Sequence, residues 1–129
     1  GVVSQTLTRM KEEFGSRPED LRVAIGPAAS GCCYEVGSEV IEAFLMSFPA
    51  MKDHLKPTRE GHALIDLQKA NRDLLVAAGV DPERIHPSPF CTMERTDLFF
   101  SYRQEKKVYG RVGRLMAVIG RAEIHGLVQ

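Results

Sequence analysis

The sequence predicts one α/β or α+β domain of 129 residues, in which helices flank a mixed β-sheet. Segments with apolar residues at helical spacing alternate with short apolar runs of strand length. Glycines and prolines separate these segments. The length supports a single domain, because it is sufficient to bury a core and too short for two typical domains.

A helix, a turn and a strand are expected at the start of the chain. Residues 2–14 predict a helix because four apolar side chains share one helical face: Val3, Leu7, Met10 and Phe14. Gly15 suits the position that follows a helix. Residues 21–25 predict a buried strand, which ends at the pair Gly26-Pro27.

Two more helices are expected in the middle of the chain. Ser38 is expected to cap a helix over residues 39–48, whose apolar stripe comprises Val40, Ile41, Phe44, Leu45 and Phe48. Residues 56–62 are polar and are expected to form a loop. Asp66 is expected to cap the following helix over residues 67–78.

The last third of the chain predicts two strands and an ambiguous segment. Residues 85–88 are expected to return to the sheet as a short or edge strand, because proline cannot donate to a strand ladder. The pattern at residues 96–103 fits a helix or a strand equally well. Residues 104–107 are expected to be a charged loop, residues 115–119 a final strand, and residues 121–129 a loosely held tail.

Composition and charge exclude several kinds of partner. Lys and Arg total 17, as do Asp and Glu, so a net charge of zero gives no electrostatic reason to expect a nucleic acid or an anionic membrane. No apolar stretch approaches the roughly 18 residues that cross a bilayer, and no secretory leader is expected. The chain has three cysteines, two of them adjacent, which is unsuited to disulfide geometry and indicates a reducing, cytoplasmic setting. Gly1 opens directly on helical periodicity, which suggests one piece of a longer chain.

The loop over residues 26–37 is the first candidate for chemistry, because loops that follow strands of α/β proteins commonly carry the site. Its cysteines, Cys32 and Cys33, could be nucleophiles or metal ligands, although packing is the favoured interpretation. Its Tyr34-Glu35 pair could act in acid–base chemistry or bind a ribose, or Glu35 could cap the following helix.

Two further polar positions lie in the last third of the chain. Cys91 and Thr92, with Glu94 close by, form either a polar cluster or an ordinary turn. Arg103 follows an aromatic pair and could bind a carboxylate or phosphate bidentately, or form an ion pair with a helix.

Histidines offer no recognisable metal pattern. The chain has no CxxC or HExxH motif, and no histidine lies at ligand spacing from the cysteine pair. Each of the four is expected to be solvated: His54, His62, His86 and His125. The glycine-rich phosphate-binding and serine-nucleophile motifs are absent as well.

Residues 26–37, GPAASGCCYEVG, resemble the GPaIgpccYEVG loop of the laccase-domain, or YfiH-like, family. Three more segments resemble the family in order and spacing: Ile65-Asp66-Leu67 with Ala70-Asn71, Cys91-Thr92, and Phe99-Phe100-Ser101-Tyr102-Arg103 with Gly110-Arg111. The resemblance covers about residues 1–120. It implies a layered sandwich with mixed sheet, like the catalytic domain of cytotoxic necrotizing factor, that is incomplete here.

The resemblance also implies an activity. The family, first described as polyphenol oxidases or laccases, comprises purine nucleoside phosphorylases, with adenosine deaminase and methylthioadenosine phosphorylase activities in some members. Purine nucleoside and phosphate are the implied substrates. Zinc bound by two histidines and one cysteine is the implied metal site.

The motifs that supply those ligands in the family, QVHg, aDC.P and HAGWRG, are absent from this chain. The chain thus resembles the C-terminal half of the family, and none of its residues inherits a catalytic or ligand role. Zinc or copper is therefore not expected to bind this chain alone. The expected partner is the missing N-terminal half, or a second copy. The residues expected to line the substrate pocket are Gly31, Cys32, Cys33, Tyr34, Cys91, Thr92 and Arg103.

Two alternatives to a portion of a purine nucleoside phosphorylase remain. The chain could be a non-catalytic fragment or split-subunit interaction module that lacks the metal site. It could also be a copper oxidase of phenols, although the lack of histidine-rich ligand clusters argues against that activity.

Overall fold

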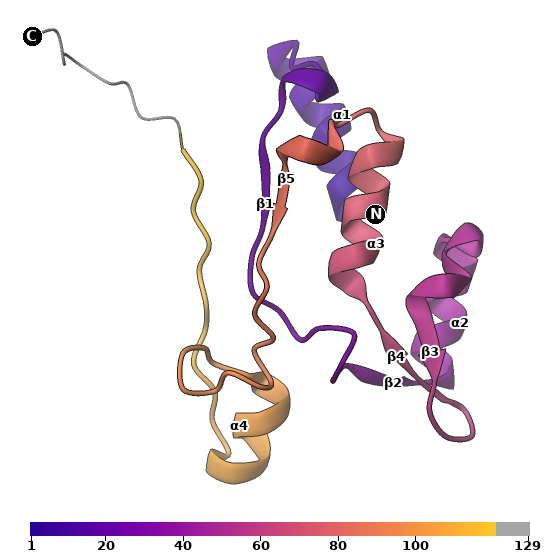
Figure 1. Ribbon diagram of the computed structural model, residues 1–129, viewed down its shortest axis with the longest axis vertical. Coiled ribbons are helices and arrows are strands. Elements are labelled where there is room, and N and C mark those ends of the chain that lie inside the picture. Colours follow the sequence, from indigo (N-terminus) through magenta and orange to yellow (C-terminus); the bar gives the residue numbers. More distant parts are fainter. Residues whose placement is uncertain (121–129) are drawn as a thin grey trace, which may run out of the picture.

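The computed structural model describes residues 1–120, in which helices alternate with short strands (Figure 1). The helices are α1 (Val2–Phe14), α2 (Ser38–Ser47), α3 (Leu67–Ala77) and α4 (Tyr102–Tyr109). The strands are β1 (Val23–Ile25), β2 (Glu35–Gly37), β3 (Leu55–Pro57), β4 (His62–Ile65) and β5 (Ile85–Pro87). Short 3-10 helices complete the order: η1 (Pro18–Asp20), η2 (Pro49–His54) and η3 (Pro82–Arg84). None of the described helices has the length and apolar character to cross a bilayer.

Parallel and antiparallel strand pairs both occur, which confirms the predicted mixed α/β class. β1 and β5 pair in parallel, with Val23 opposite Ile85. β2, β4 and β3 form an antiparallel sheet in that order. The parallel pair requires a long crossover, and α3 lies within it. β5 ends in Pro87, in agreement with its prediction as an edge strand.

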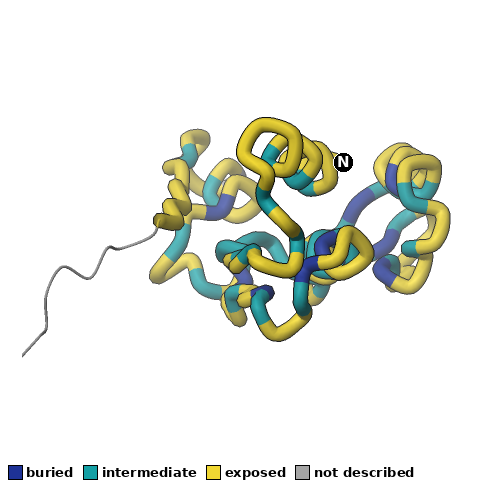
Figure 2. The backbone as a smooth tube through the Cα atoms, turned by 90° about the horizontal axis from the view of Figure 1, so that it is seen from above, coloured by how far each residue is buried: buried dark blue, intermediate teal, exposed yellow. Residues whose placement is uncertain are grey.

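Two small hydrophobic cores stabilise these sheets. In the first, the buried residues are Val36, Phe44, Ile65 and Ala70, and α2 packs against β2 and β4. In the second, Leu75, Val80 and Ile85 are buried beneath α1, with Val3 and Leu7 packed against them. Buried segments are short, and most of the backbone is exposed or partly exposed (Figure 2).

Helices α1 and α3 cover one face of the β1–β5 pair. Val23 and Ile25 point into the second core on that face. Ala24 and His86 are opposite each other in the strand register and both are exposed. In the described part of the chain, the second face of this pair therefore lacks a covering layer.

The expected strand at residues 115–119 is wrong. Residues 111–120 form an extended segment without regular secondary structure, in which Ala117 lies beside Gly26. A strand requires a neighbour that completes its hydrogen-bond ladder, and the described residues supply none for this segment. Its apolar side chains are consequently exposed: Leu115, Met116, Val118 and Ile119.

Several local predictions are corrected for physical reasons. Ser38 does not cap α2, because β2 runs directly into the helix and Gly37 occupies the cap position. Residues 56–62 are not one polar loop, since both ends pair as β3 and β4. Residues 104–107 are helical within α4, where the Glu105 side chain accepts the Ser101 N–H that the helix leaves free.

Other boundaries agree with the sequence. Asp66 caps α3 by accepting the Lys69 N–H at 2.9 Å. Gly15 ends α1 with a φ of 63°, a conformation that favours glycine. Phe14 and Val40 are exposed rather than packed on their predicted apolar stripes. The predicted tail, residues 121–129, lies outside the described residues.

Ile65 provides a test of the first core, because it is 1% exposed and lies at the centre of that cluster. We expect Ile65→Ala to lower the free energy of unfolding by about 2–5 kcal/mol, through lost burial and a residual cavity. Urea denaturation measures the change. Met46→Ala removes a side chain that is 84% exposed and should change stability by less than about 0.5 kcal/mol. Equal losses in the two variants would contradict this description of the core.

Candidate functional site

The loops that follow β1 and β5 leave the same edge of the parallel pair and continue side by side. Ser88 N donates to Ile25 O at 2.7 Å, and Thr92 N donates to Ala28 O at 3.0 Å. An isolated parallel bridge joins Ala28 to Cys91. The carboxyl ends of adjacent parallel strands are the usual location of sites in α/β proteins, so this edge is the candidate site.

Gln68, in the first turn of α3, joins the two loops. Its side-chain Nε2 donates to Gly26 O at 3.1 Å and to Ser88 O at 3.4 Å. Its Oε1 lies 3.4 Å from the hydroxyl of Ser30. One half-buried amide therefore positions the start of both loops relative to α3.

The three cysteines lie together at this edge. The Sγ atoms of Cys32 and Cys33 are 3.1 Å apart. Cys91 comes from the other loop, is buried, and accepts the Ser30 N–H at 3.5 Å. A carboxylate oxygen of Glu94 completes a group in which all four candidate ligand atoms lie within 4.8 Å of one another.

The three thiols differ in pKa because their surroundings differ. Hydrogen bonding with Cys33, together with burial, raises the pKa of Cys32 to about 12. Burial raises the pKa of Cys91, but backbone N–H groups of Ser30, Met93 and Glu94 oppose it and hold that pKa at about 7. Donors directed at a sulfur stabilise its thiolate, so Cys91 is the most acidic of the three.

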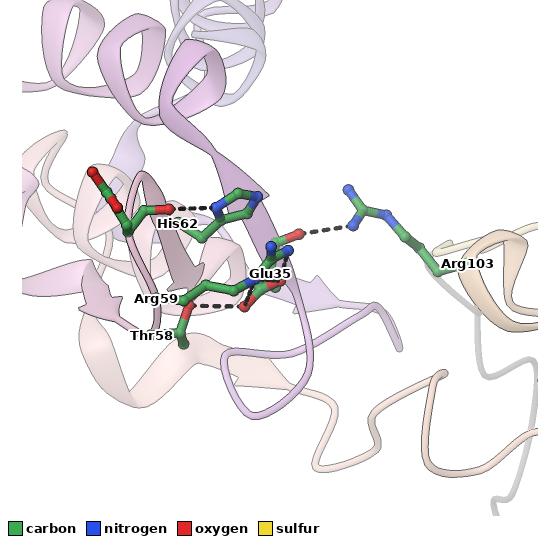
Figure 3. Close-up of polar contacts among 6 residues, drawn as sticks. Glu35, Thr58, Arg59, His62 and Arg103 are labelled. Carbon is green, nitrogen blue, oxygen red and sulfur yellow. Dashed lines mark hydrogen bonds and ion pairs between the residues drawn. The ribbon is translucent and has the colours of Figure 1, made fainter.

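Tyr34 and Arg103 form a second part of the site. The Arg103 guanidinium lies 4.8 Å from the centre of the Tyr34 ring, a cation–π arrangement. Its Nη1 donates to the backbone carbonyl of Glu35 at 2.7 Å (Figure 3). No ion pair with a helix involves Arg103 among the described residues, so the guanidinium retains donors for another acceptor.

The Glu35 side chain faces the β3–β4 hairpin instead of Arg103 (Figure 3). Its carboxylate accepts hydrogen bonds from Thr58 Oγ1 and Arg59 Nη2, each at 2.8 Å. The Arg59 and Thr58 donors lower the pKa of Glu35 to about 2. Glu35 is thus an ionised anchor of the hairpin that neither caps α2 nor acts as a general acid at neutral pH.

An open polar cavity of about 330 Å³ adjoins the cysteine loop. Gly31 and Cys32 line it from the loop after β1. Two lysines and two aspartates line its other side, so their charges balance: Lys56, Lys69, Asp53 and Asp66. Its volume is at the lower end of the range for small-molecule sites. The structure thus places Gly31 and Cys32 at a cavity. Their role in binding substrate stays a prediction.

Histidine positions differ from the expectation of four solvated side chains. His54 is 8% exposed, with Nε2 2.9 Å from Asp73 Oδ2 and Nδ1 3.2 Å from Met51 O. His62 is half-buried, with Nδ1 2.8 Å from Glu60 O, whereas His86 is exposed. His125 lies outside the described residues.

Comparison with known proteins identifies the family. The family described as multi-copper polyphenol oxidoreductase laccase matches residues 1–122. The chain belongs to this family. It is 40% identical over 107 residues to the purine nucleoside phosphorylase YlmD of Geobacillus stearothermophilus, and 38% identical over 112 residues to a purine nucleoside phosphorylase of Bacteroides thetaiotaomicron.

Solved structures of the family have the same fold. The crystal structure of YlmD from Geobacillus stearothermophilus superposes with a TM-score of 0.76 at 33% identity, covering 86% of this chain and 42% of that one. The Bacillus licheniformis protein YfiH gives a TM-score of 0.75 at 33% identity, covering 81% of this chain and 40% of that one. These similarities confirm the YfiH-like fold that the sequence predicts.

The chain aligns with only part of each of these relatives. The alignments cover 82% and 86% of it, but only 38% of the Geobacillus relative and 42% of the Bacteroides relative. The chain therefore spans about two fifths of the length of the curated relatives it matches.

Five of the predicted site residues lie in two separate groups. Cys32, Cys33 and Cys91 form the thiol cluster, while Tyr34 contacts Arg103. Glu94, which the sequence placed in a possible polar cluster with Cys91 and Thr92, joins the thiol cluster. Sequence reasoning missed two contributors, Ser30 and Gln68, because their contacts depend on tertiary structure.

The zinc site that the resemblance implies does not fit the described residues. That site requires two histidines and a cysteine, and no histidine joins the thiol cluster in residues 1–120. Both ring nitrogens of His54 already contact protein oxygens. The expectation that this chain binds no metal is nevertheless unsupported, because three thiols and a carboxylate converge on one point.

Gly31 provides a test of the loop geometry. A Cβ at this position would lie 2.9 Å from Asp66 Cβ, at the start of α3. We expect Gly31→Ala to displace the loop and lower the free energy of unfolding by about 1–3 kcal/mol, as for other overpacked sites. Gly37→Ala is the matched control, since its nearest new contact would be 3.9 Å away. Urea denaturation compares them, and unchanged stability in Gly31→Ala would contradict the close approach.

Proposed function

We propose that this chain is the C-terminal portion of a purine nucleoside phosphorylase, with a purine nucleoside and phosphate as substrates. The observation that carries the proposal is the identity of 38–40% to relatives named as purine nucleoside phosphorylases. The site supports it, because a cavity with polar lining residues adjoins the loop after β1. Arg103, at the start of α4, also keeps guanidinium donors free for an anion. Nucleoside phosphorolysis needs such contacts to position an anion beside a neutral ligand.

The contribution of this chain is binding and orientation. Arg103 is proposed to bind phosphate, since a guanidinium presents a planar set of donors to an oxyanion. The loop from Gly31 to Tyr34, with Cys91 and Thr92, is proposed to line the pocket. Zinc, bound by ligands outside this chain, would activate the attacking oxygen in the complete enzyme.

Adenosine and inosine are the proposed nucleosides, with adenosine deaminase and methylthioadenosine phosphorylase as further activities. The proposed location is the cytoplasm, where thiols such as Cys32 and Cys91 remain reduced.

The proposed partner is the N-terminal half of the same domain. An open apolar cavity of about 490 Å³ lies between α1 and β1, where Leu7, Val23 and Ile119 are among the residues that line it. The uncovered face at Ala24 and the exposed residues 115–119 enlarge this apolar surface. Large exposed apolar patches usually mark interfaces, and the curated relatives are longer than this chain by enough to supply the cover.

A specific observation favours the alternative of a non-catalytic interaction module. The described residues do not form the histidine and cysteine set that the family resemblance implies. A split-subunit or fragment role would use the same apolar surface without turnover. The two proposals differ in whether activity appears when the missing half is supplied.

A chimera tests the enzymatic proposal. The segment of Geobacillus YlmD that aligns with this chain is replaced by this chain, and release of hypoxanthine from inosine and phosphate is measured. We expect phosphorolysis by the chimera and none by the isolated chain. A folded, metal-loaded chimera that lacks turnover on inosine and adenosine would overturn the proposal and favour the interaction module.

Arg103 is tested in the same chimera. We expect Arg103→Ala to raise KM for phosphate by about 10-fold or more, because a charge-assisted hydrogen bond is lost. Arg9→Ala is the control, since Arg9 is exposed on α1 and pairs with Glu13 at 3.3 Å. An unchanged KM for phosphate in Arg103→Ala would refute its role, whatever the effect on kcat.

The apolar surface predicts association. Sedimentation velocity of the isolated chain is expected to show self-association, or a complex when the N-terminal segment of the Geobacillus relative is added. Thermal unfolding should shift upward in that complex, as linkage requires. A monodisperse monomer that unfolds cooperatively and ignores the added segment would count against the proposed partner.

A further inference from the structure

Three thiols and one carboxylate meet where the loops after β1 and β5 run side by side. We propose that Cys32, Cys33, Cys91 and Glu94 form a binding site for a thiophilic divalent cation of the zinc class. All four ligands belong to this chain. The site is therefore independent of the proposed enzymatic activity.

The geometry is close to that of a tetrahedral site. Zinc–sulfur bonds of about 2.3 Å place two sulfurs of a tetrahedron about 3.8 Å apart. The four ligand atoms lie within 4.8 Å of one another, and the Cys32 and Cys33 sulfurs are 3.1 Å apart. Cys32 and Glu94 are exposed, so their side chains have room to rotate and adjust these separations.

The donor atoms select the type of metal. Three sulfurs disfavour magnesium and calcium, which take oxygen ligands. The carboxylate disfavours copper(I), whose preferred ligands are thiolates and thioethers. Sulfur together with carboxylate oxygen suits zinc, or cadmium and cobalt(II) as its spectroscopic substitutes.

The surroundings of Cys91 resemble the supporting contacts of a metal ligand. The residue is only 4% exposed, and its Sγ accepts the Ser30 N–H at 3.5 Å. Its backbone is fixed by the bridge to Ala28. Hydrogen bonds to a ligand atom orient it and offset its charge. The exposed Cys32 and Glu94 leave the opposite side of the cluster open for entry of the ion.

Bound metal would connect segments that are distant in sequence. Cys32 and Cys33 belong to the loop after β1, whereas Cys91 and Glu94 follow β5. A cation shared by both would cross-link the two loops beyond the last strand bridge. Binding only to the folded arrangement would also raise stability.

Cadmium titration tests the site. The 129-residue chain is kept reduced and anaerobic, and thiolate-to-Cd²⁺ charge-transfer absorbance is followed in the ultraviolet. We expect about one ion per chain, displacement by Zn²⁺, and a higher thermal unfolding midpoint with either metal. No charge-transfer band, with all three thiols shown to be free, would overturn the proposal.

Variants assign the ligands. Cys91→Ser and Cys32→Ser should each weaken binding about 100-fold or more, since losing a ligand costs at least as much as losing a supporting contact. Cys32→Ser serves if Cys91→Ser fails to fold, because Cys32 is exposed and its replacement leaves the core intact. Far-UV circular dichroism confirms folding.

Glu94→Gln isolates the carboxylate, with Glu83→Gln as its matched control. Glu83 is also an exposed carboxylate near the start of a short turn, but it lies outside the cluster. We expect weaker binding in Glu94→Gln and unchanged binding in Glu83→Gln. Equal affinities in these two variants, or undiminished Cd²⁺ binding in a folded Cys32→Ser variant, would refute the proposed ligand set.

Discussion

The parallel pairing of β1 with β5 is the constraint on which the site depends. It joins residues about sixty positions apart in the chain and makes their following loops leave from one edge. The ladder then extends beyond the regular strands, through Ser88 N to Ile25 O and the Ala28–Cys91 bridge. Backbone hydrogen bonds fix both loops in this way. They, and not side-chain packing alone, hold Cys91 beside the first loop.

The helices contribute to the same arrangement from one side. α3 carries Gln68, which bonds to both loops, and begins at Asp66, against which Gly31 packs. Further along the same helix, Leu75 is buried in the second core. The site is consequently built on an element with its own packing, which limits how far the loops can move independently of it.

Much of the fold could be predicted from the sequence where a local rule applies. Helical periodicity and terminal glycine or aspartate predicted α1 and α3 with their ends at Gly15 and Asp66. The final strand at residues 115–119 was mispredicted because strand formation depends on a neighbour, which local composition does not reveal. The family followed from ordered motifs, and the comparisons confirm it.

The candidate site was predictable only in part. The Gly26–Gly37 loop and Cys91-Thr92 were recognisable as unusual segments, but the convergence of Cys32, Cys33, Cys91 and Glu94 is set by strand register. Spacing rules for metal sites assume ligands close together in sequence, and they fail for this cluster. Similarly, the Arg103 contact with Tyr34 joins two segments that no local pattern relates.

Pro87 makes the two free edges of the β1–β5 pair unequal as partners for a further strand. Ser88 N points toward β1, so the alternation of a strand places the nitrogen of Pro87 on the opposite, outer edge, where it has no hydrogen to donate. The free edge of β1 contains no proline. An added strand would therefore find a more complete set of donors and acceptors beside β1 than beside β5. The pair can therefore be extended by a strand beside β1, whereas the missing N–H of Pro87 disfavours extension beside β5.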